Sequence, residues 1–127
     1  MPDTFLVTGG AGFVGSNLCL ALKHDYPTAR IIALDNLKRR GSELNIPRFK
    51  DAGVEFLHGD IRNPEDLHEV GGFDVMIECS AEPSVLAGYD GSPAYLLNTN
   101  LVGALTCFEA CRRHKADVLF LSTSRVY

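Results

Sequence analysis

A glycine-rich segment that joins an apolar run to a helical pattern constrains the fold of this chain more than any other feature. Residues 8–15 have the sequence TGGAGFVG, the apolar residues 5–7 precede them, and apolar residues at helical spacing follow. A second apolar run, residues 31–34, ends in Asp35, 20 residues after the last glycine of the loop. A strand, a glycine turn, a helix and a second strand with a terminal acid together indicate a dinucleotide-binding site.

Three glycines of this loop have separate physical roles. Gly9 permits a tight turn in which a Cβ atom would be penalised at positive φ. Gly12 allows the backbone to approach a pyrophosphate, and Gly15 allows the helix to pack against the strands. The first-turn amides, including those of Phe13 and Val14, would face the phosphate charge because the helix itself leaves them without partners. The alternative is a strand-to-helix turn that binds no ligand.

Asp35 sets the expected cofactor. A carboxylate at the end of the second strand accepts hydrogen bonds from an adenosine ribose and repels a 2′-phosphate, which favours NAD over NADP. Lys38, Arg39 and Arg40 follow closely and keep NADP as the less favoured alternative, because a guanidinium can accommodate a 2′-phosphate. The same cations could instead contact the ribose or the pyrophosphate, or cover a solvated loop.

Apolar runs alternate with helical patterns along the chain, which predicts an α/β fold: a Rossmann-like, doubly wound parallel sheet with helices on its faces. The apolar continuity of residues 75–77 and 118–121 is typical of buried parallel strands. The five expected strands are residues 4–7, 30–34, 54–58, 74–79 and 118–121. Because Rossmann sheets usually have more strands, we expect residues 1–127 to be an incomplete NAD-binding domain, truncated after about five strands.

Start and stop signals define three expected helices. Residues 16–24 form the first. An Asn-Pro pair at residues 63–64 supplies a cap and a first-turn proline for the second, which the glycines 71–72 end. A longer helix opens at residues 92–93 and ends in the cations of residues 112–115, which are favoured at a helix C-terminus.

Composition excludes several classes of function. The 127 residues are 46% hydrophobic and 22% charged, as in an ordinary single globular domain. The net charge of −4 argues against nucleic acid or an anionic membrane as the main partner. No apolar run reaches the roughly 20 residues of a membrane span. The N-terminus lacks the basic region of a signal peptide, so we expect a cytoplasmic protein.

The four cysteines, Cys19, Cys79, Cys107 and Cys111, form no Cys-x-x-Cys motif. Cys107 and Cys111 are four residues apart on one helix face, but two thiols alone do not make a zinc site. We therefore expect small buried thiols in a reducing compartment and no metal site.

Five segments together resemble the NAD-binding part of the extended short-chain dehydrogenase/reductase family, which includes the nucleotide-sugar epimerases and dehydratases. In the order of that family, they are residues 8–15, 35–37, 59–62, 98–103 and 121–127. Two stretches, residues 35–47 and 78–90, resemble the CDP-paratose (CDP-tyvelose) 2-epimerases in particular.

The resemblance implies cofactor contacts beyond the glycine loop and Asp35. They fall on Asn36, Leu37, Arg39, Asp60, Ile61, Ser80, Ala81, Thr99, Asn100 and Ser122. Asp60 would accept from the adenine amino group, while the backbone at Ile61 reads the ring edge. Ser80 and Ala81 would border the ribose and the phosphates. A turn-forming role for Asp60 and a polar helix contact for Asn100 are the alternatives.

Glu78 departs from the family pattern, in which many relatives have histidine near this position and alanine at the position of Ser80. We expect Glu78 to face away from the cofactor or to pair with a neighbour, without a catalytic role.

The resemblance also implies a catalytic role for Thr123, whose hydroxyl would hold the sugar oxygen that is oxidised. A threonine that caps a turn is the alternative. The family's Tyr-x-x-x-Lys base is absent, because none of Tyr26, Tyr89, Tyr95 and Tyr127 has a lysine four residues later. We therefore expect this chain alone to be inactive.

The implied parent activity is an NAD-dependent nucleotide-sugar epimerase. It would invert C2 of a CDP-3,6-dideoxyhexose by transient oxidation to a keto-sugar, so a CDP-linked sugar and a second copy of the protein are the expected partners. A dehydratase or 4-epimerase of the same superfamily is the alternative, although Ser124 and Arg125 replace the Asp-Glu that dehydratases often have after the threonine. A non-catalytic dinucleotide sensor is the alternative from a different class.

Overall fold

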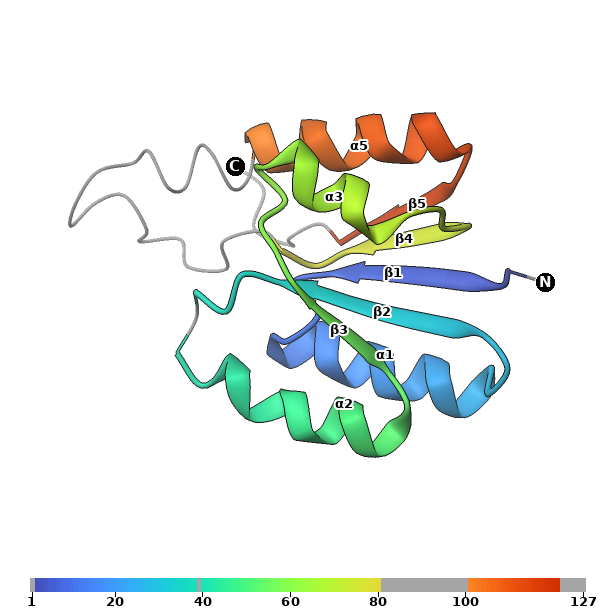
Figure 1. The fold of residues 1–127 in the computed structure, drawn as a ribbon, viewed down its shortest axis with the longest axis vertical. Helices are drawn as coiled ribbons and strands as arrows, with labels where there is room; N and C mark the ends of the chain where they lie inside the picture. The colour runs from blue at the N-terminus through green and yellow to red at the C-terminus, as the bar shows by residue number, and fades with distance from the viewer. Residues whose placement is uncertain (1, 39, 81–100, 122–127) are drawn as a thin grey trace.

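The computed structural model of the chain describes residues 2–38, 40–80 and 101–121. In it, five parallel strands form one sheet in the order β3-β2-β1-β4-β5 (Figure 1). The strands are β1 (Thr4–Thr8), β2 (Arg30–Asp35), β3 (Glu55–His58), β4 (Val75–Glu78) and β5 (Asp117–Phe120). This order reverses direction at β1 and confirms the predicted doubly wound sheet.

Helices cover both faces of the sheet. They are α1 (Phe13–Asp25), the 3₁₀ turn η1 (Ser42–Asn45), α2 (Ile46–Ala52), α3 (Pro64–Val70) and α5 (Gly103–His114). Figure 1 shows α1 and α2 on one face and α3 and α5 on the other. Because successive strand side chains point to opposite faces, β1 places Phe5 and Val7 in the core under α1 and α2, and Leu6 in the core under α3 and α5.

The predicted helix signals act as expected where the structure describes them. The Asn63 side chain accepts a hydrogen bond from the Glu65 amide at 3.2 Å, and Gly71 ends α3 with φ of 80°. The basic residues 112–114 occupy the last turn of α5. The predicted start of the long helix at residues 92–93 lies outside the described residues.

Sequence analysis did not predict η1 and α2. The signals were present, because Pro47 lies in the first turn of α2 and Gly53, with φ of 83°, ends it. The helix has only seven residues, too few for a clear apolar stripe. The helix buries Phe49, whose ring lies 6.4 Å from that of Phe56 on β3.

The strand predicted at residues 118–121 is present as β5, but the prediction that it is buried was wrong. Within the described residues, β5 pairs with β4 alone and forms one edge of the sheet. Its side chains are accordingly exposed, Leu119 by 58%. The central strands behave as predicted, and Leu6, Val7 and Ile32 are fully buried.

Candidate functional site

The carboxyl ends of the parallel strands meet at one edge of the sheet, where open α/β folds bind ligands. The register sets Thr8 of β1 beside Leu34 and Glu78, and Asp35 beside His58. The glycine loop that follows Thr8 therefore lies between the end of β2 and the end of β4. This is also the point at which the strand order reverses.

The glycine loop is a turn that side chains could not occupy. Gly9 has φ of +65°, and a Cβ atom on it would lie 2.5 Å from the Cys79 carbonyl oxygen. A Cβ on Gly15 would lie 2.2 Å from the Gly9 carbonyl oxygen, so the first turn of α1 packs directly on the loop. Gly12 is less constrained, because a Cβ atom on it would lie 3.3 Å from the same Gly9 oxygen. The predicted turn role of Gly9 is thus confirmed, whereas the close packing at Gly15 is against the loop and not, as predicted, against the strands.

The N-terminus of α1 is open to an anion. Its N-cap is Gly12, which supplies no side-chain cap, and its first turn contains no acidic residue. Phe13 and Val14 are exposed by 84% and 51%. The first turn of this 13-residue helix thus begins beside the glycine loop with neither a side-chain cap nor an acid, an arrangement that fits a diphosphate.

Asp35 connects β2 to this loop. Its Oδ2 accepts a hydrogen bond from the Ala11 amide at 2.9 Å, and its Oδ1 accepts one from the Leu37 amide at 2.8 Å. An ionised carboxylate has about four acceptor positions, so these two bonds leave capacity for ribose hydroxyls. The carboxylate is partly exposed at the edge where the predicted ribose would lie.

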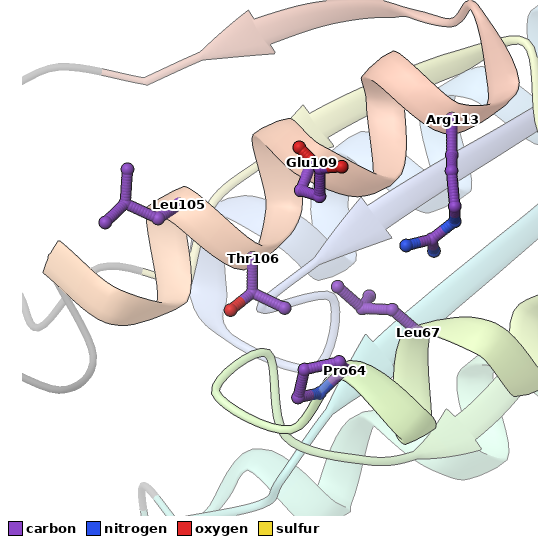
Figure 2. Close-up of a pocket in the computed structure, with 6 residues that line it drawn as sticks. All are labelled: Pro64, Leu67, Leu105, Thr106, Glu109 and Arg113. Carbon is purple, nitrogen blue, oxygen red and sulfur yellow. The ribbon is translucent and has the colours of Figure 1, made fainter.

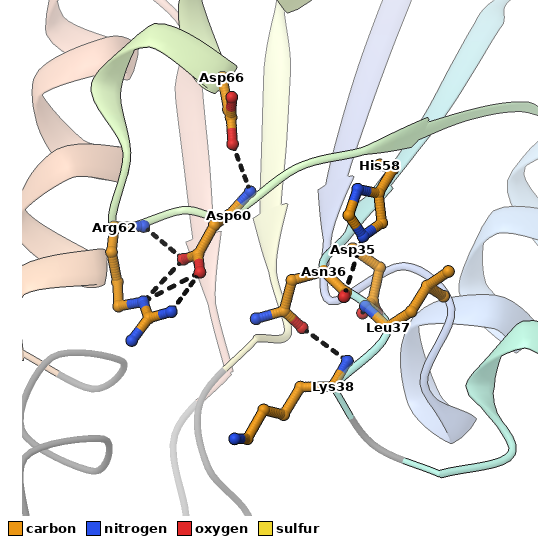
Figure 3. A network of polar contacts seen from close by, with 8 residues as sticks. All are labelled: Asp35, Asn36, Leu37, Lys38, His58, Asp60, Arg62 and Asp66. Carbon is orange, nitrogen blue, oxygen red and sulfur yellow. Dashed lines mark hydrogen bonds and ion pairs between the residues drawn. The ribbon is translucent and has the colours of Figure 1, made fainter.

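Asn36 continues the chain from Asp35 and organises the next turn (Figure 3). Its side-chain oxygen accepts from the Lys38 amide at 3.0 Å, and its carbonyl oxygen lies 3.1 Å from His58 Nε2. These bonds join the segments that follow β2 and β3, on the side of the sheet where the adenosine half of a dinucleotide is expected.

The Asp60 carboxylate is held by Arg62, as Figure 3 shows. Oδ1 accepts from the Arg62 amide and Nε, both at 2.9 Å, and Oδ2 accepts from Nη2 at 2.5 Å. The Asp60 amide in turn donates to Asp66 Oδ2 at 2.8 Å. Hydrogen bonding to the Arg62 guanidinium holds the pKa of Asp60 below its ordinary value. Sequence analysis did not place Arg62 among the predicted site residues, although the Asp-x-Arg spacing could have suggested that it pairs with Asp60.

Ile61 lies between these two residues but points elsewhere. Its side chain is buried in the core under α3 and α5, with Leu67 and Met76. Only its backbone is therefore available to a ligand, in line with the predicted backbone contact.

Glu78 forms hydrogen bonds with neighbouring residues, which is one of the two arrangements that we expected for it. The side chain is only 2% exposed, and its Oε1 accepts hydrogen bonds from the Thr8 hydroxyl at 2.9 Å and the Ser80 amide at 2.7 Å. The Ser80 hydroxyl donates to the same oxygen. Ser80 is half-buried beside the glycine loop.

Several predicted site residues lie outside the described residues, so their contacts stay predictions. They are Arg39, Ala81, Thr99, Asn100, Ser122 and the expected catalytic Thr123. The described members all lie at or just after the carboxyl end of a strand: Gly9 to Gly15, Asp35 to Leu37, Asp60 with Ile61, and Ser80.

A separate hollow of about 230 Å³ lies between α3 and α5 (Figure 2). Its lining consists of Pro64, Leu67, Leu105, Thr106, Glu109 and Arg113. It is smaller than typical ligand pockets and contains none of the predicted cofactor residues.

The cysteine side chains are free thiols, and three of the four are buried. Burial raises the pKa of Cys19 and that of Cys79 to about 12. Within residues 2–38, 40–80 and 101–121, no group of three or more His, Cys, Asp or Glu side chains could hold a metal ion. No helix in the same ranges is both long and apolar enough for a membrane span.

Comparisons with known proteins agree with this geometry. The model of the NAD dependent epimerase/dehydratase family matches residues 5–127. The chain is 34% identical to dTDP-glucose 4,6-dehydratase of Mycobacterium tuberculosis over 123 residues, which are 96% of this chain and 37% of that protein. It is 33% identical to CDP-paratose 2-epimerase of Salmonella typhi over 129 aligned residues, with the same two shares.

A solved structure of dTDP-glucose 4,6-dehydratase from Bacillus anthracis, in complex with NAD, matches with a TM-score of 0.78 and 30% identity. The match covers 94% of this chain and 37% of that one. The chain thus spans a little over one third of the length of these relatives.

Proposed function

The chain belongs to the NAD dependent epimerase/dehydratase family, and we propose that it is the NAD-binding part of an enzyme that acts on nucleotide sugars. The single observation that carries this proposal is the loop in which Gly15 packs on the Gly9 carbonyl while Asp35 holds the Ala11 amide. This loop presents backbone donors and a carboxylate side by side. Those are the two kinds of group that a diphosphate and its neighbouring ribose require.

The described residues offer groups for the diphosphate and the adenosine half of NAD. The first-turn amides of α1 would hold the diphosphate, and Asp35 would accept from the adenosine ribose. The turn that contains Asp60 and Arg62 would border the adenine, with the Ile61 backbone beside it. When bound, NAD supplies a reversible acceptor for a hydride from the sugar.

The finer activity that we favour is inversion of C2 in a CDP-linked 3,6-dideoxyhexose. Its support is the resemblance of residues 35–47 and 78–90 to the CDP-paratose 2-epimerases, together with the similarity of the chain to CDP-paratose 2-epimerase of Salmonella typhi. A dehydratase is the second candidate, because the Mycobacterium tuberculosis dehydratase is equally similar. Ser124 and Arg125 after Thr123 favour the epimerase over the dehydratase.

Thr123 is the residue that we propose for contact with the reacting sugar oxygen. The chain contains no Tyr-x-x-x-Lys, and the relatives that it matches are more than twice its length. We therefore infer that the base and most of the sugar site are supplied by residues other than these 127, and that this chain alone does not turn over a CDP-sugar.

A second copy of the protein is the other partner that we propose. Leu105 and Phe108 on α5 are exposed, and the Phe108 ring packs at a tilt against Phe120 of the exposed strand β5, with ring centroids 5.7 Å apart. A surface of large apolar side chains on one helix is typical of a contact between copies. The free thiols support a reducing, cytoplasmic location.

Isothermal titration calorimetry of the chain with NAD and NADP tests the cofactor proposal. We expect NAD to bind more tightly than NADP, because Asp35 would repel a 2′-phosphate. Absence of binding for both NAD and NADP would reject the assignment of a dinucleotide site. A coupled assay with CDP-paratose on the same sample tests the second part, since measurable turnover would show that residues 1–127 contain a complete catalytic site.

A further inference from the structure

One carboxylate oxygen at the end of β4 collects hydrogen bonds from three protein groups. Oε1 of Glu78 receives the Thr8 hydroxyl at 2.9 Å, the Ser80 amide at 2.7 Å and the Ser80 hydroxyl. The sheet geometry brings these groups together. Thr8 lies opposite Glu78 in the register of β1 and β4, and Ser80 is two residues further along the chain. The Glu78 side chain is 2% exposed, so water does not compete for this oxygen.

These contacts fix the direction of each hydrogen bond. An amide N–H can only donate, so Oε1 is an acceptor at its bond to Ser80. Each hydroxyl has a single proton, which it gives to Oε1. The Ser80 oxygen therefore has lone pairs available but no further proton to donate. A neighbouring ligand can donate a hydrogen bond to Ser80 Oγ, whereas a phosphate oxygen cannot receive one from it.

Ser80 also lies against the glycine loop. A Cβ atom on Gly9 would come within 2.7 Å of the Ser80 Cα, so the two backbones are in direct contact. Asp35 lies on the opposite, β2 side of the same loop, where the adenosine ribose is expected. A dinucleotide that spans the reversal of strand order places its nicotinamide half on the β4 side. A dinucleotide bound in this way would place its second ribose beside Ser80, next to the diphosphate.

We propose that Glu78 is a positioning residue that makes Ser80 a one-way acceptor for a hydroxyl of the nicotinamide-side ribose. This inference rests on the proposed function, because it assumes that the site takes NAD. It gives Ser80 a specific contact in place of a general one with ribose and phosphates. It also gives a role to a buried acid that forms no ion pair within residues 2–38, 40–80 and 101–121.

Calorimetric titration of the chain with NAD, and with NAD that lacks the 2′- or the 3′-hydroxyl on the nicotinamide ribose, tests this inference. Ser80→Ala is expected to weaken NAD about threefold to tenfold, in line with the loss of one hydrogen bond. The same variant should bind one of the two deoxy analogues as tightly as the wild type does. Glu78→Gln keeps an acceptor oxygen in place and should stay within about twofold of wild type for all three ligands.

Thr8→Val provides the matched control. It removes another donor to the same Oε1, but Thr8 is fully buried and cannot touch the ligand. We expect lower thermal stability and an unchanged ratio of NAD to deoxy-NAD affinity. Glu78→Leu leaves the Ser80 hydroxyl able to donate as well as to accept, so we expect the ratio of NAD affinity to deoxy-NAD affinity to fall in this variant.

Two outcomes separate this inference from the function on which it rests. Failure of the wild-type chain to bind NAD would overturn both. Binding of NAD by the wild type, with both deoxy analogues weakened equally in wild type and Ser80→Ala, would overturn the role of Ser80 and leave the NAD site intact. Loss of the discrimination in Glu78→Leu but not in Glu78→Gln would support the positioning role.

Discussion

The carboxylate of Asp35 holds the amide of Ala11 at 2.9 Å, across 24 residues of sequence. Ala11 is fully buried in the middle of the glycine loop, and the other Asp35 oxygen holds the Leu37 amide. The acid therefore supports the shape of the loop in addition to any contact with a ribose. This double role leads to a prediction that separates stability from cofactor choice.

We predict that Asp35→Ala lowers both stability and cofactor affinity. The buried Ala11 amide would lose its partner, which costs about 1–3 kcal/mol of unfolding free energy. NAD affinity should fall at least about tenfold, and the preference for NAD over NADP should disappear because the repelling charge is gone. Urea denaturation and calorimetry measure the two effects. Asp51→Ala, at an exposed acid of α2, should change stability by less than about 0.5 kcal/mol.

Gly15→Ala is predicted to distort the loop. Its Cβ would lie 2.2 Å from the Gly9 carbonyl oxygen, which is backbone and cannot rotate away. We expect a loss of about 1–3 kcal/mol in unfolding free energy, as for other overpacked positions, together with a loss of NAD binding. Gly72→Ala is the matched control, because nothing lies within 4 Å of the added carbon. Equal stability of the two variants would contradict the close contact.

Much of this fold could be predicted from the sequence because its local signals agree with one another. The glycine loop, the apolar runs and the Asn63-Pro64 cap all appear in the structure at the predicted places. The exposure of β5 could not be predicted in this way. An apolar run is typical of a buried strand, whereas the position of β5 at the sheet edge depends on which strands pair with it.

The candidate site was predicted in part for a similar reason. Backbone roles such as that of Gly9 follow from the local sequence and were predicted correctly. Side-chain pairing was harder, because Glu78 joins Thr8 across 70 residues through the strand register. The Asp60–Arg62 pair is local in sequence. The sequence alone, however, does not distinguish an aspartate that accepts hydrogen bonds from a ligand from one that accepts them from an arginine.

The thiols are predicted to be inert in the folded protein. With a pKa of about 12, Cys19 and Cys79 would each be thiolate in roughly one molecule in 10,000 at pH 8, against about one in four for a free cysteine. Labelling with a chromogenic disulfide reagent should therefore be slow in buffer. All four cysteines should react quickly in guanidinium chloride. Rapid labelling of the native chain would show that these side chains are more accessible than described.

The Asp60–Arg62 pair is predicted to contribute to stability in a defined pH range. Hydrogen bonding to Arg62 lowers the pKa of Asp60 in the folded state, while the unfolded value is about 3.9. The unfolded state therefore binds the proton first. The contribution of the Asp60–Arg62 pair to the free energy of unfolding is complete above about pH 4. It is lost as the pH falls through the lower pKa that Asp60 has in the folded state. Arg62→Met should raise the Asp60 pKa toward its ordinary value and flatten this part of the stability curve.

Carboxyl-carbon NMR titration of Asp60, together with urea denaturation between about pH 2 and pH 7, measures both effects. Arg30→Met is the matched control, since Arg30 on β2 lowers the pKa of Glu55 on β3 by the same kind of bond between exposed side chains. That variant should shift Glu55 and leave Asp60 unchanged. An Asp60 carboxyl that titrates at its ordinary pKa in the wild type would contradict the pairing. In an Asp60→Asn background, Arg62→Met should have a smaller effect on the acid limb of the stability curve, because the Asp60 carboxyl whose pKa it changes is absent.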